Sequence, residues 1–256
     1  MLFSCKGEVK KGKIDYKVVE KASVNDSTQT SQKAIKWKSL LEECMHKPLF
    51  QDAFFLGLED SIHIGSINNR LETNVNKRVS VSIFDTTINK NIGAIFNVDG
   101  QFNCYSTVDT VLKDDFVFEI RNALKTASEF AFIGDIVDTT HLNIKVANIS
   151  ENNLYLDNLI TILQKSEDSS LLKYRKILSE SGNALLARSV MVLGFSAEFL
   201  ITRDLTQVEL NQLKNESAFA VDNGNCRIRI MENGYLQVLV EKPYTIFGQF
   251  YSFDGL

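Results

Sequence analysis

Two stretches of the chain decide the expected fold: IGAIFNVDGQFNCYS at Ile92–Ser106 and CRIRIMENGYLQVLV at Cys226–Val240. Each places a short polar turn with one glycine between two runs of alternating apolar and polar residues, which is typical of a β-hairpin. In the second stretch, a three-residue loop ending at Gly234 puts the apolar residues on one face. This register pairs Ile230 with Leu236, Ile228 with Val238 and Cys226 with Val240. A slip of one residue would turn that face towards water, so we expect the register to be firm.

The first stretch predicts a hairpin of the same kind. Its loop is Val98-Asp99-Gly100, with Gly100 in the left-handed position, where a residue with a Cβ would be strained. The expected pairs are Phe96 with Phe102, Ala94 with Cys104, and Ile92 with Ser106. The segments that flank the two hairpins do not repeat one another, so two independent hairpins are favoured over an internal duplication.

Apolar periodicity places helices between groups of strands. The segments expected to be helical are 34–45 before Pro48, 109–132 before Gly134, 154–163, 171–178, 184–193, and a helix that runs from the capping box of Thr206 and Glu209 to about residue 215. The segments expected to be strands are 2–24 (as two strands), 61–67, 78–84, 141–146, 198–202 and 244–253. This order is typical of an α+β fold with mainly antiparallel sheets and packed helices. We expect two lobes that form one body: an N-terminal α+β lobe at 1–150 and a C-terminal helical region at 151–256 that ends in an antiparallel hairpin.

The composition is that of a soluble globular protein, with 44% hydrophobic and 23% charged residues. No apolar run reaches the length of about 18 residues that a membrane-spanning helix needs, and the apolar run at the N-terminus is too short for a signal peptide. We therefore expect a cytoplasmic protein without a membrane span. The four cysteines are widely spaced and form no CxxC pair, so we expect reduced thiols. Cys104 and Cys226 fall on the apolar faces of the predicted hairpins, where cysteine packs as a small core residue.

The sequence shows little that is typical of an enzyme. It has no phosphate-binding loop, nucleophile elbow or zinc motif, and its three histidines stand apart, so we expect neither a metal nor a cofactor. One segment, GDIVDTTHLNIKV at 134–146, follows the pattern of some metal-dependent nucleases, in which an Asp precedes a strand with an acid-x-Lys motif. The candidate catalytic residues there are Asp135, Asp138 and Lys145. Asn143 occupies the position of the second acid, which weakens metal binding.

The second hairpin carries four candidate binding residues on its outward face: Arg227, Arg229, Tyr235 and Gln237. Arginines beside an aromatic ring can contact phosphates and bases, and they are also over-represented at protein interfaces. The first 50 residues hold ten lysines and six acidic residues, whereas the whole chain has a net charge of −4. Because the lysines near the N-terminus alternate with acidic residues, they are typical of a solvated strand face. The net acidic charge favours protein contact over nucleic acid.

The sequence therefore predicts a non-catalytic cytoplasmic protein that binds a protein partner or a second copy of itself through a sheet edge or a hairpin face. Two alternatives remain open. One is a divalent-metal-dependent nuclease or phosphodiesterase that uses Asp135, Asp138 and Lys145. The other is a nucleic-acid-binding module that uses the N-terminal lysines together with Arg227 and Arg229.

Overall fold

The computed structural model describes residues 15–18, 28–69, 81–86, 93–104, 106–130, 132–213, 217–231, 234–254 and 256. Antiparallel sheets with packed helices form an α+β fold, which confirms the predicted fold class. The strands are β1 (Asp15–Val18), β2 (Phe54–Glu59), β3 (Ser66–Asn69), β4 (Val81–Ser82), β5 (Phe96–Asn103), β6 (Val137–Val146), β7 (Asn148–Leu154), β8 (Asn183–Val192), β9 (Phe195–Ile201), β10 (Ser217–Val221), β11 (Gly224–Ile230), β12 (Tyr235–Glu241) and β13 (Tyr244–Asp254). The helices are α1 (Thr28–Met45), α2 (Lys113–Lys125), α3 (Ile133–Ile136), α4 (Leu156–Lys165), α5 (Ser169–Leu178) and α6 (Gln207–Leu213), with 3-10 turns η2 (Ile83–Asp85), η4 (Thr110–Leu112) and η5 (Ser128–Phe130).

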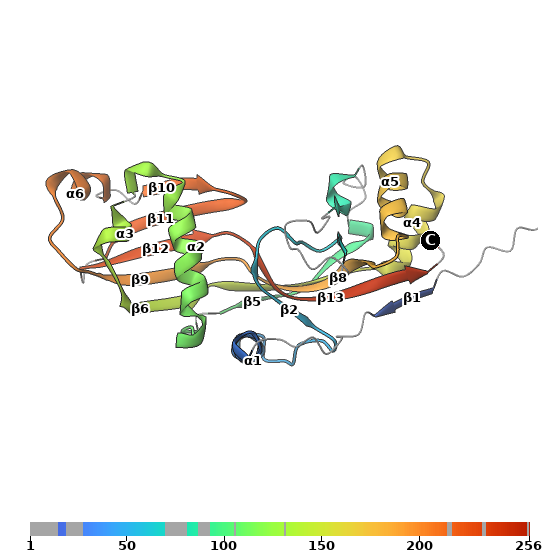
Figure 1. The fold of residues 1–256 in the computed structure, drawn as a ribbon, viewed down its shortest axis with the longest axis horizontal. Coiled ribbons are helices and arrows are strands. Elements are labelled where there is room, and N and C mark those ends of the chain that lie inside the picture. The colour runs from blue at the N-terminus through green and yellow to red at the C-terminus, as the bar shows by residue number, and fades with distance from the viewer. Residues whose placement is uncertain are drawn as a thin grey trace, which may run out of the picture.

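The described strands form two sheets that continue into one another. The five-stranded sheet has the order β10-β11-β12-β9-β6, and the eight-stranded sheet contains the path β1-β13-β8-β3-β4, with β2 on β13 and with β7 and β5 following from β8. At three places a strand of one sheet is followed by a strand of the other after only one or two residues. These pairs are β6 and β7, β8 and β9, and β12 and β13. Backbone hydrogen bonds span the junction, from Ala147 N to Gly194 O at 3.0 Å and from Leu193 N to Asn148 O at 2.8 Å. The result is one elongated, twisted ribbon of strands (Figure 1).

The predicted lobe boundary lies inside this ribbon. Residue 150 is within β7, and both sheets take strands from each side of that position. The strands that position the candidate site below, β6, β9, β11 and β12, lie on both sides of residue 150.

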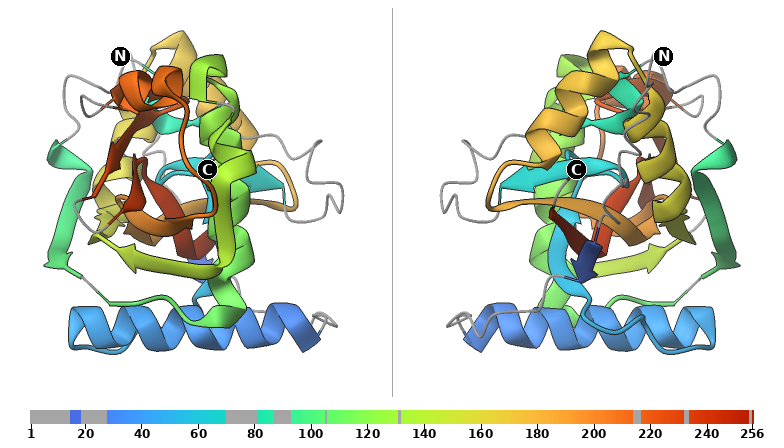
Figure 2. Two further views of the ribbon diagram at one scale, coloured as in Figure 1. Left: turned by 90° about the vertical axis from the view of Figure 1, so that its left-hand side faces the viewer. Right: turned by 90° about the vertical axis from the view of Figure 1, so that its right-hand side faces the viewer.

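Helix α2 lies across one face of the five-stranded sheet (Figures 1 and 2). Its buried stripe includes Phe116, Ile120 and Leu124, and the Phe116 ring meets Phe195 of β9 edge to face at 4.8 Å between centroids. Burial of such an apolar stripe is the main source of stability for an amphipathic helix. The apolar side chains of the sheet pack against α2 on this face, so the polar side chains point to the opposite face.

Helices α4 and α5 cover the other end of the molecule (Figure 1). Leu159, Leu163 and Tyr174 are buried against the eight-stranded sheet, and the Tyr174 hydroxyl donates a hydrogen bond to Gly65 O at 2.8 Å. Asp168 caps α5 by accepting from Ser170 N at 2.8 Å. Helices were predicted from periodicity here and at α1, and these predictions are confirmed.

The second predicted hairpin is confirmed in its register. Strands β11 and β12 pair Cys226 with Val240, Ile228 with Val238 and Ile230 with Leu236. Gly234 has φ 79°, the left-handed conformation that the loop requires. The alternating pattern decided this register because only one pairing buries every apolar side chain on one face.

The first predicted hairpin is wrong. Residues 96–103 form one strand, β5, which pairs with β7 and has a bulge between Val98 and Gly100. A bulge adds one residue to a strand and shifts the alternation of the residues that follow, so two alternating runs around Asp-Gly fit a bulge as well as a turn. A Cβ on Gly100 would lie 2.6 Å from Cζ of Phe102, so a larger residue there would displace that ring.

Several other expectations need correction. The helix expected at 184–193 is strand β8, which is buried on both faces and therefore lacks the alternation of a half-exposed strand. The helix expected at 109–132 is interrupted: α2 is flanked by η4 and η5, and Gly134 lies inside α3 instead of ending a helix. The capping box at α6 is confirmed, with Thr206 N donating to Glu209 Oε2 at 2.8 Å. Of the strands expected at 2–24 only β1 is described. Of the strand expected at 78–84, residues 78–80 lie outside the described part, Val81–Ser82 form β4, and Ile83–Asp85 form the 3-10 turn η2 instead of a strand.

Cys44 of α1 and Cys104 after β5 are joined by a disulfide, with their Cα atoms 5.3 Å apart. This corrects the expectation of reduced thiols for that pair. The separation of 60 residues in the sequence did not indicate this disulfide. The packing of α1 beside β5 brings the two cysteines together. Cys226 is a buried free thiol, and burial raises its pKa to about 12.

Candidate functional site

A ladder of polar side chains crosses the outward face of the five-stranded sheet. Strand register places Arg229, Gln237, Glu198 and Asn143 side by side on β11, β12, β9 and β6. Arg229 Nε donates to Gln237 Oε1 at 2.8 Å, and Gln237 Nε2 donates to Glu198 Oε1 at 3.3 Å. Asn143 Nδ2 donates to the other carboxylate oxygen of Glu198 at 3.3 Å. We call these four residues the polar ladder.

An ion pair lies beside the polar ladder. Arg227 of β11 forms an ion pair with Glu241 of β12, and both side chains are partly exposed, at 39% and 43%. Arg227 and Arg229 line a surface hollow of about 220 Å³ together with Gln237 and Leu239. Each arginine is therefore held in position by a neighbouring acceptor while its guanidinium still borders solvent.

The structure brings together three of the four predicted binding residues. Arg227, Arg229 and Gln237 share the hollow, and Tyr235 lies farther along β12, opposite Leu200. Sequence reasoning missed Glu198, although this one acidic residue interrupts the apolar run FSAEFLI of β9. In the sequence, Asn143 was interpreted only as a residue that replaces a metal-binding acid. In the structure its side-chain amide donates a hydrogen bond to Glu198.

No described helix packs on this outward face. Helix α2 lies on the opposite face, where Cys226, Ile228 and Val238 are fully buried (Figures 1 and 2). Successive side chains of a strand point to opposite faces, so burial of these residues turns Arg227, Arg229 and Gln237 outward. The face can donate and accept hydrogen bonds at fixed spacing.

The candidate catalytic residues are only partly described. Asp135 belongs to α3 and Asp138 to β6, and their side chains lie outside the described part of the chain. Asp138 pairs with Leu200 of β9 and Lys145 pairs with Ser196. Those partners lie four positions apart on an extended strand, so the Cα atoms of Asp138 and Lys145 are about 13 Å apart. Within the ranges that the structure describes, no set of three or more His, Cys, Asp or Glu side chains could hold a metal ion.

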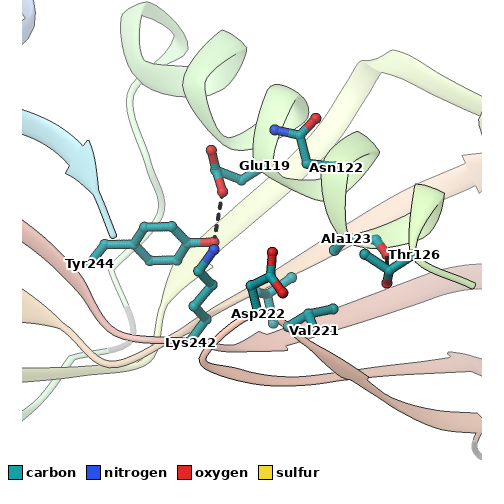
Figure 3. Close-up of a pocket in the computed structure, with 9 residues that line it drawn as sticks. Glu119, Asn122, Ala123, Thr126, Val221, Asp222, Lys242 and Tyr244 are labelled. Atoms are coloured by element: carbon teal, nitrogen blue, oxygen red, sulfur yellow. Dashed lines mark hydrogen bonds between the residues drawn. The ribbon is translucent and has the colours of Figure 1, made fainter. Parts of the chain in front are cut away.

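A second cluster lies between α2 and the junction of the two sheets (Figure 3). The Tyr244 hydroxyl donates to Glu119 Oε2 at 2.9 Å, and the Lys242 ammonium lies 5.4 Å from the centre of the Tyr244 ring. Lys242 is buried and forms an ion pair with Asp60. Sequence analysis missed this cluster, because nothing in the aromatic tail indicates that Tyr244 would meet a helix more than a hundred positions earlier.

Burial perturbs the acids of this cluster. It raises the pKa of the Glu119 carboxyl, an effect that the hydrogen bond from Tyr244 opposes. It also raises the pKa of the Tyr244 hydroxyl, together with the negative charge of Glu119. The cavity that these side chains line has a volume of about 60 Å³, which accommodates a few water molecules and excludes a metabolite. The cluster therefore serves to tie α2 to β13.

Comparisons with known proteins identify no family. No protein-family model matches the sequence, and no curated protein matches it. Among solved structures, a bacterial gasdermin from Bradyrhizobium tropiciagri is similar over 76% of this chain and 79% of its own, at 10% sequence identity and a TM-score of 0.33. Likeness at this level carries no argument about function. In the described residues, no helix has both the length and the apolar character needed to cross a membrane.

Proposed function

We propose that this protein is a non-catalytic interaction or assembly protein that binds a protein partner through the outward face of its five-stranded sheet. The observation that carries the proposal is the polar ladder, in which side chains from four strands are fixed by hydrogen bonds on a face that no described helix covers. A surface of pre-positioned donors and acceptors loses little side-chain entropy on binding.

The mixture of charges on this face favours a protein over a nucleic acid. Glu198 lies in the ladder with Arg229, and Glu241 is paired with Arg227. A nucleic-acid surface is typically a basic patch that neutralises several phosphates, whereas these carboxylates would repel phosphate. Arginine and tyrosine enriched among mixed polar groups are typical of a protein interface.

The test is site-specific crosslinking in the cells that make the protein. A photoreactive amino acid replaces Leu239, which lines the hollow but takes no part in the ladder. The matched control replaces Leu172 on α5, an exposed leucine at 44% on the other end of the molecule. We expect protein adducts of discrete mass from position 239 and none from position 172. Adding Arg229→Glu to the first variant should strongly reduce its adducts, because it reverses a charge that faces the partner.

Three results would overturn the proposal. Equal crosslinking at both positions would show that the face has no preferred partner. Bound nucleic acid whose affinity falls steeply with salt, and which is lost in Arg227→Ala/Arg229→Ala, would favour the nucleic-acid-binding alternative. Phosphodiester cleavage that requires a divalent cation and is abolished by Lys145→Ala would favour the nuclease.

A further inference from the structure

The outermost strand of the five-stranded sheet, β10, has one open edge. It pairs with β11 on one side, and no described strand pairs with its other side. Its sequence is SAFAV, and both Ala218 and Ala220 are exposed. An open strand edge offers a row of backbone N–H and C=O groups to any other strand.

This edge lacks the features that usually prevent strand pairing. Native edges are protected by charged residues, proline, bulges, short length or a covering segment. β10 contains no charged residue and no proline, and its register with β11 is regular over all five residues. Three other described edges are protected: β5 has a bulge, β4 has two residues, and β6 has an irregularity and is bridged by Thr107.

The turn into β11 determines which groups of β10 face outward. Val221 pairs with Gly224 across a two-residue turn whose second residue, Asn223, has φ 60°. The pair that closes such a turn exchanges both of its hydrogen bonds, and the pairs then alternate along the strands. Residues 217, 219 and 221 therefore bond to β11. The backbone groups of Ala218 and Ala220 point to the open edge.

We propose that β10 pairs with β10 of a second copy, antiparallel and centred on Phe219. This register sets Ala218 opposite Ala220 of the second copy, and the reverse, so that four backbone hydrogen bonds form. If the pair were centred on Ala218 or Ala220, the other of these two residues would lie opposite a position outside β10. Fewer backbone hydrogen bonds would then form. Phe219 stays on the core side, stacked on Phe130 at 5.5 Å between ring centres. An uncharged strand meets its own copy without repulsion, which makes a second copy the fitting partner.

Pairing in this way joins two five-stranded sheets into one of ten strands, so that their polar ladders lie on a shared surface. The inference deepens the proposed assembly function, on which it rests, by naming a second copy as the partner at β10. Its test changes two residues of β10, of which Ala218 lies opposite Arg227, and leaves the four residues of the polar ladder unchanged. Failure of one test therefore does not decide the other.

The experiment is sedimentation equilibrium of the purified full chain over a range of concentrations. The disrupting variant is Ala218→Glu/Ala220→Glu, which sets two pairs of like charges opposite each other across the proposed pairing. We expect its self-association constant to fall by about tenfold or more. The rescue variant is Ala218→Glu/Ala220→Lys, in which each Glu faces a Lys of the second copy, and its association should return to near the wild-type value.

Controls separate pairing from charge and folding. Ile35→Glu/Leu172→Glu adds the same two charges at exposed helical positions, at 63% and 44%, and should associate as the wild type does. Circular dichroism and thermal melting check that each variant is folded. A wild type that is monomeric at every concentration overturns the proposal. So does a disrupting variant that associates normally, or a folded rescue variant that associates no better than the disrupting one.

Discussion

Replacement of Glu151 by glutamine should destabilise the fold more than any change on the exposed faces. Glu151 lies in β7 with a side chain only 5% exposed, between two cations. Its carboxylate accepts from Arg188 Nη2 at 3.0 Å and forms an ion pair with Lys47. Those cations also lie over aromatic rings, Arg188 at 4.6 Å from the centre of Phe50 and Lys47 at 5.2 Å from that of Phe102. The carboxylate thus joins β7, β8 and the segment after α1.

The magnitude follows from burial. Removing one partner of a fully buried ion pair typically costs about 3–5 kcal/mol, because the remaining charge is left without compensation. The side chains of Arg188 and Lys47 are 32% and 41% exposed, so water can solvate part of each charge in the variant. We therefore expect Glu151→Gln to lower the free energy of unfolding by about 2–3 kcal/mol. In a chain of this size that corresponds to a fall in Tm of about 4–12 °C.

The assay is urea unfolding of a double-mutant cycle. Glu151→Gln, Arg188→Met and the double variant isolate the coupling between the two residues, and a second cycle with Lys47→Met measures the other cation. We expect stronger coupling to Arg188, the less exposed cation. A loss below about 0.5 kcal/mol for Glu151→Gln, or no coupling to Arg188, would refute the reasoning, because both outcomes are typical of a solvated surface pair.

Three further predictions concern the rest of the molecule. Glu119→Gln keeps the hydrogen bond from Tyr244 and removes a carboxylate whose pKa is raised by burial. At pH values above that pKa the variant should therefore have a higher Tm than the wild type, and the difference should shrink as the pH falls through the pKa. Ile228→Ala truncates a fully buried side chain and should lower the free energy of unfolding by about 3 kcal/mol in urea titrations. Gly100→Ala should cost about 1 kcal/mol, because the new Cβ displaces the ring of Phe102.

Each of these has a control and a contradicting outcome. The sign for Glu119 follows because a raised pKa means that the folded state binds the proton more tightly, so wild-type stability falls as the pH rises through the folded value; a benefit confined to low pH would contradict it. For Ile228, the neighbouring outward change Arg229→Ala should cost less than about 1 kcal/mol, and equal losses would contradict the assignment of faces. For Gly100, the comparison is Gly134→Ala, where a Cβ meets nothing within 4 Å; equal effects would contradict the expected clash between the new Cβ and the Phe102 ring.

Local patterns predicted the second hairpin correctly and the first incorrectly for the same physical reason. Alternation reports which residues share a face, and a turn with one glycine reports where the chain can bend. At Gly234 both signals have one solution, since the chain must return on itself to bury Ile228 against Val238. At Gly100 the partner strand is β7. A bulge satisfies the same signals when another strand supplies the apolar neighbours.

Strand β8 shows a different limit of sequence reasoning. Its run of buried residues pairs with β13 on one side and with β3 and β7 on the other. Because its side chains are buried on both faces, the sequence has neither the two-residue period of a half-exposed strand nor a polar stripe that excludes a helix. Only the presence of neighbouring strands makes it a strand.

The sequence by itself determined that Arg227, Arg229 and Gln237 share an outward face, because strand alternation and the turn at Gly234 are local properties. The tertiary structure alone decided that Glu198 and Asn143 complete the polar ladder, since β9 and β6 reach β12 from distant parts of the chain. It also decided that, among the described strands, none pairs with the outer edge of β10. Which strands become neighbours depends on how the whole apolar surface can be buried at once, and that is a property of the complete chain.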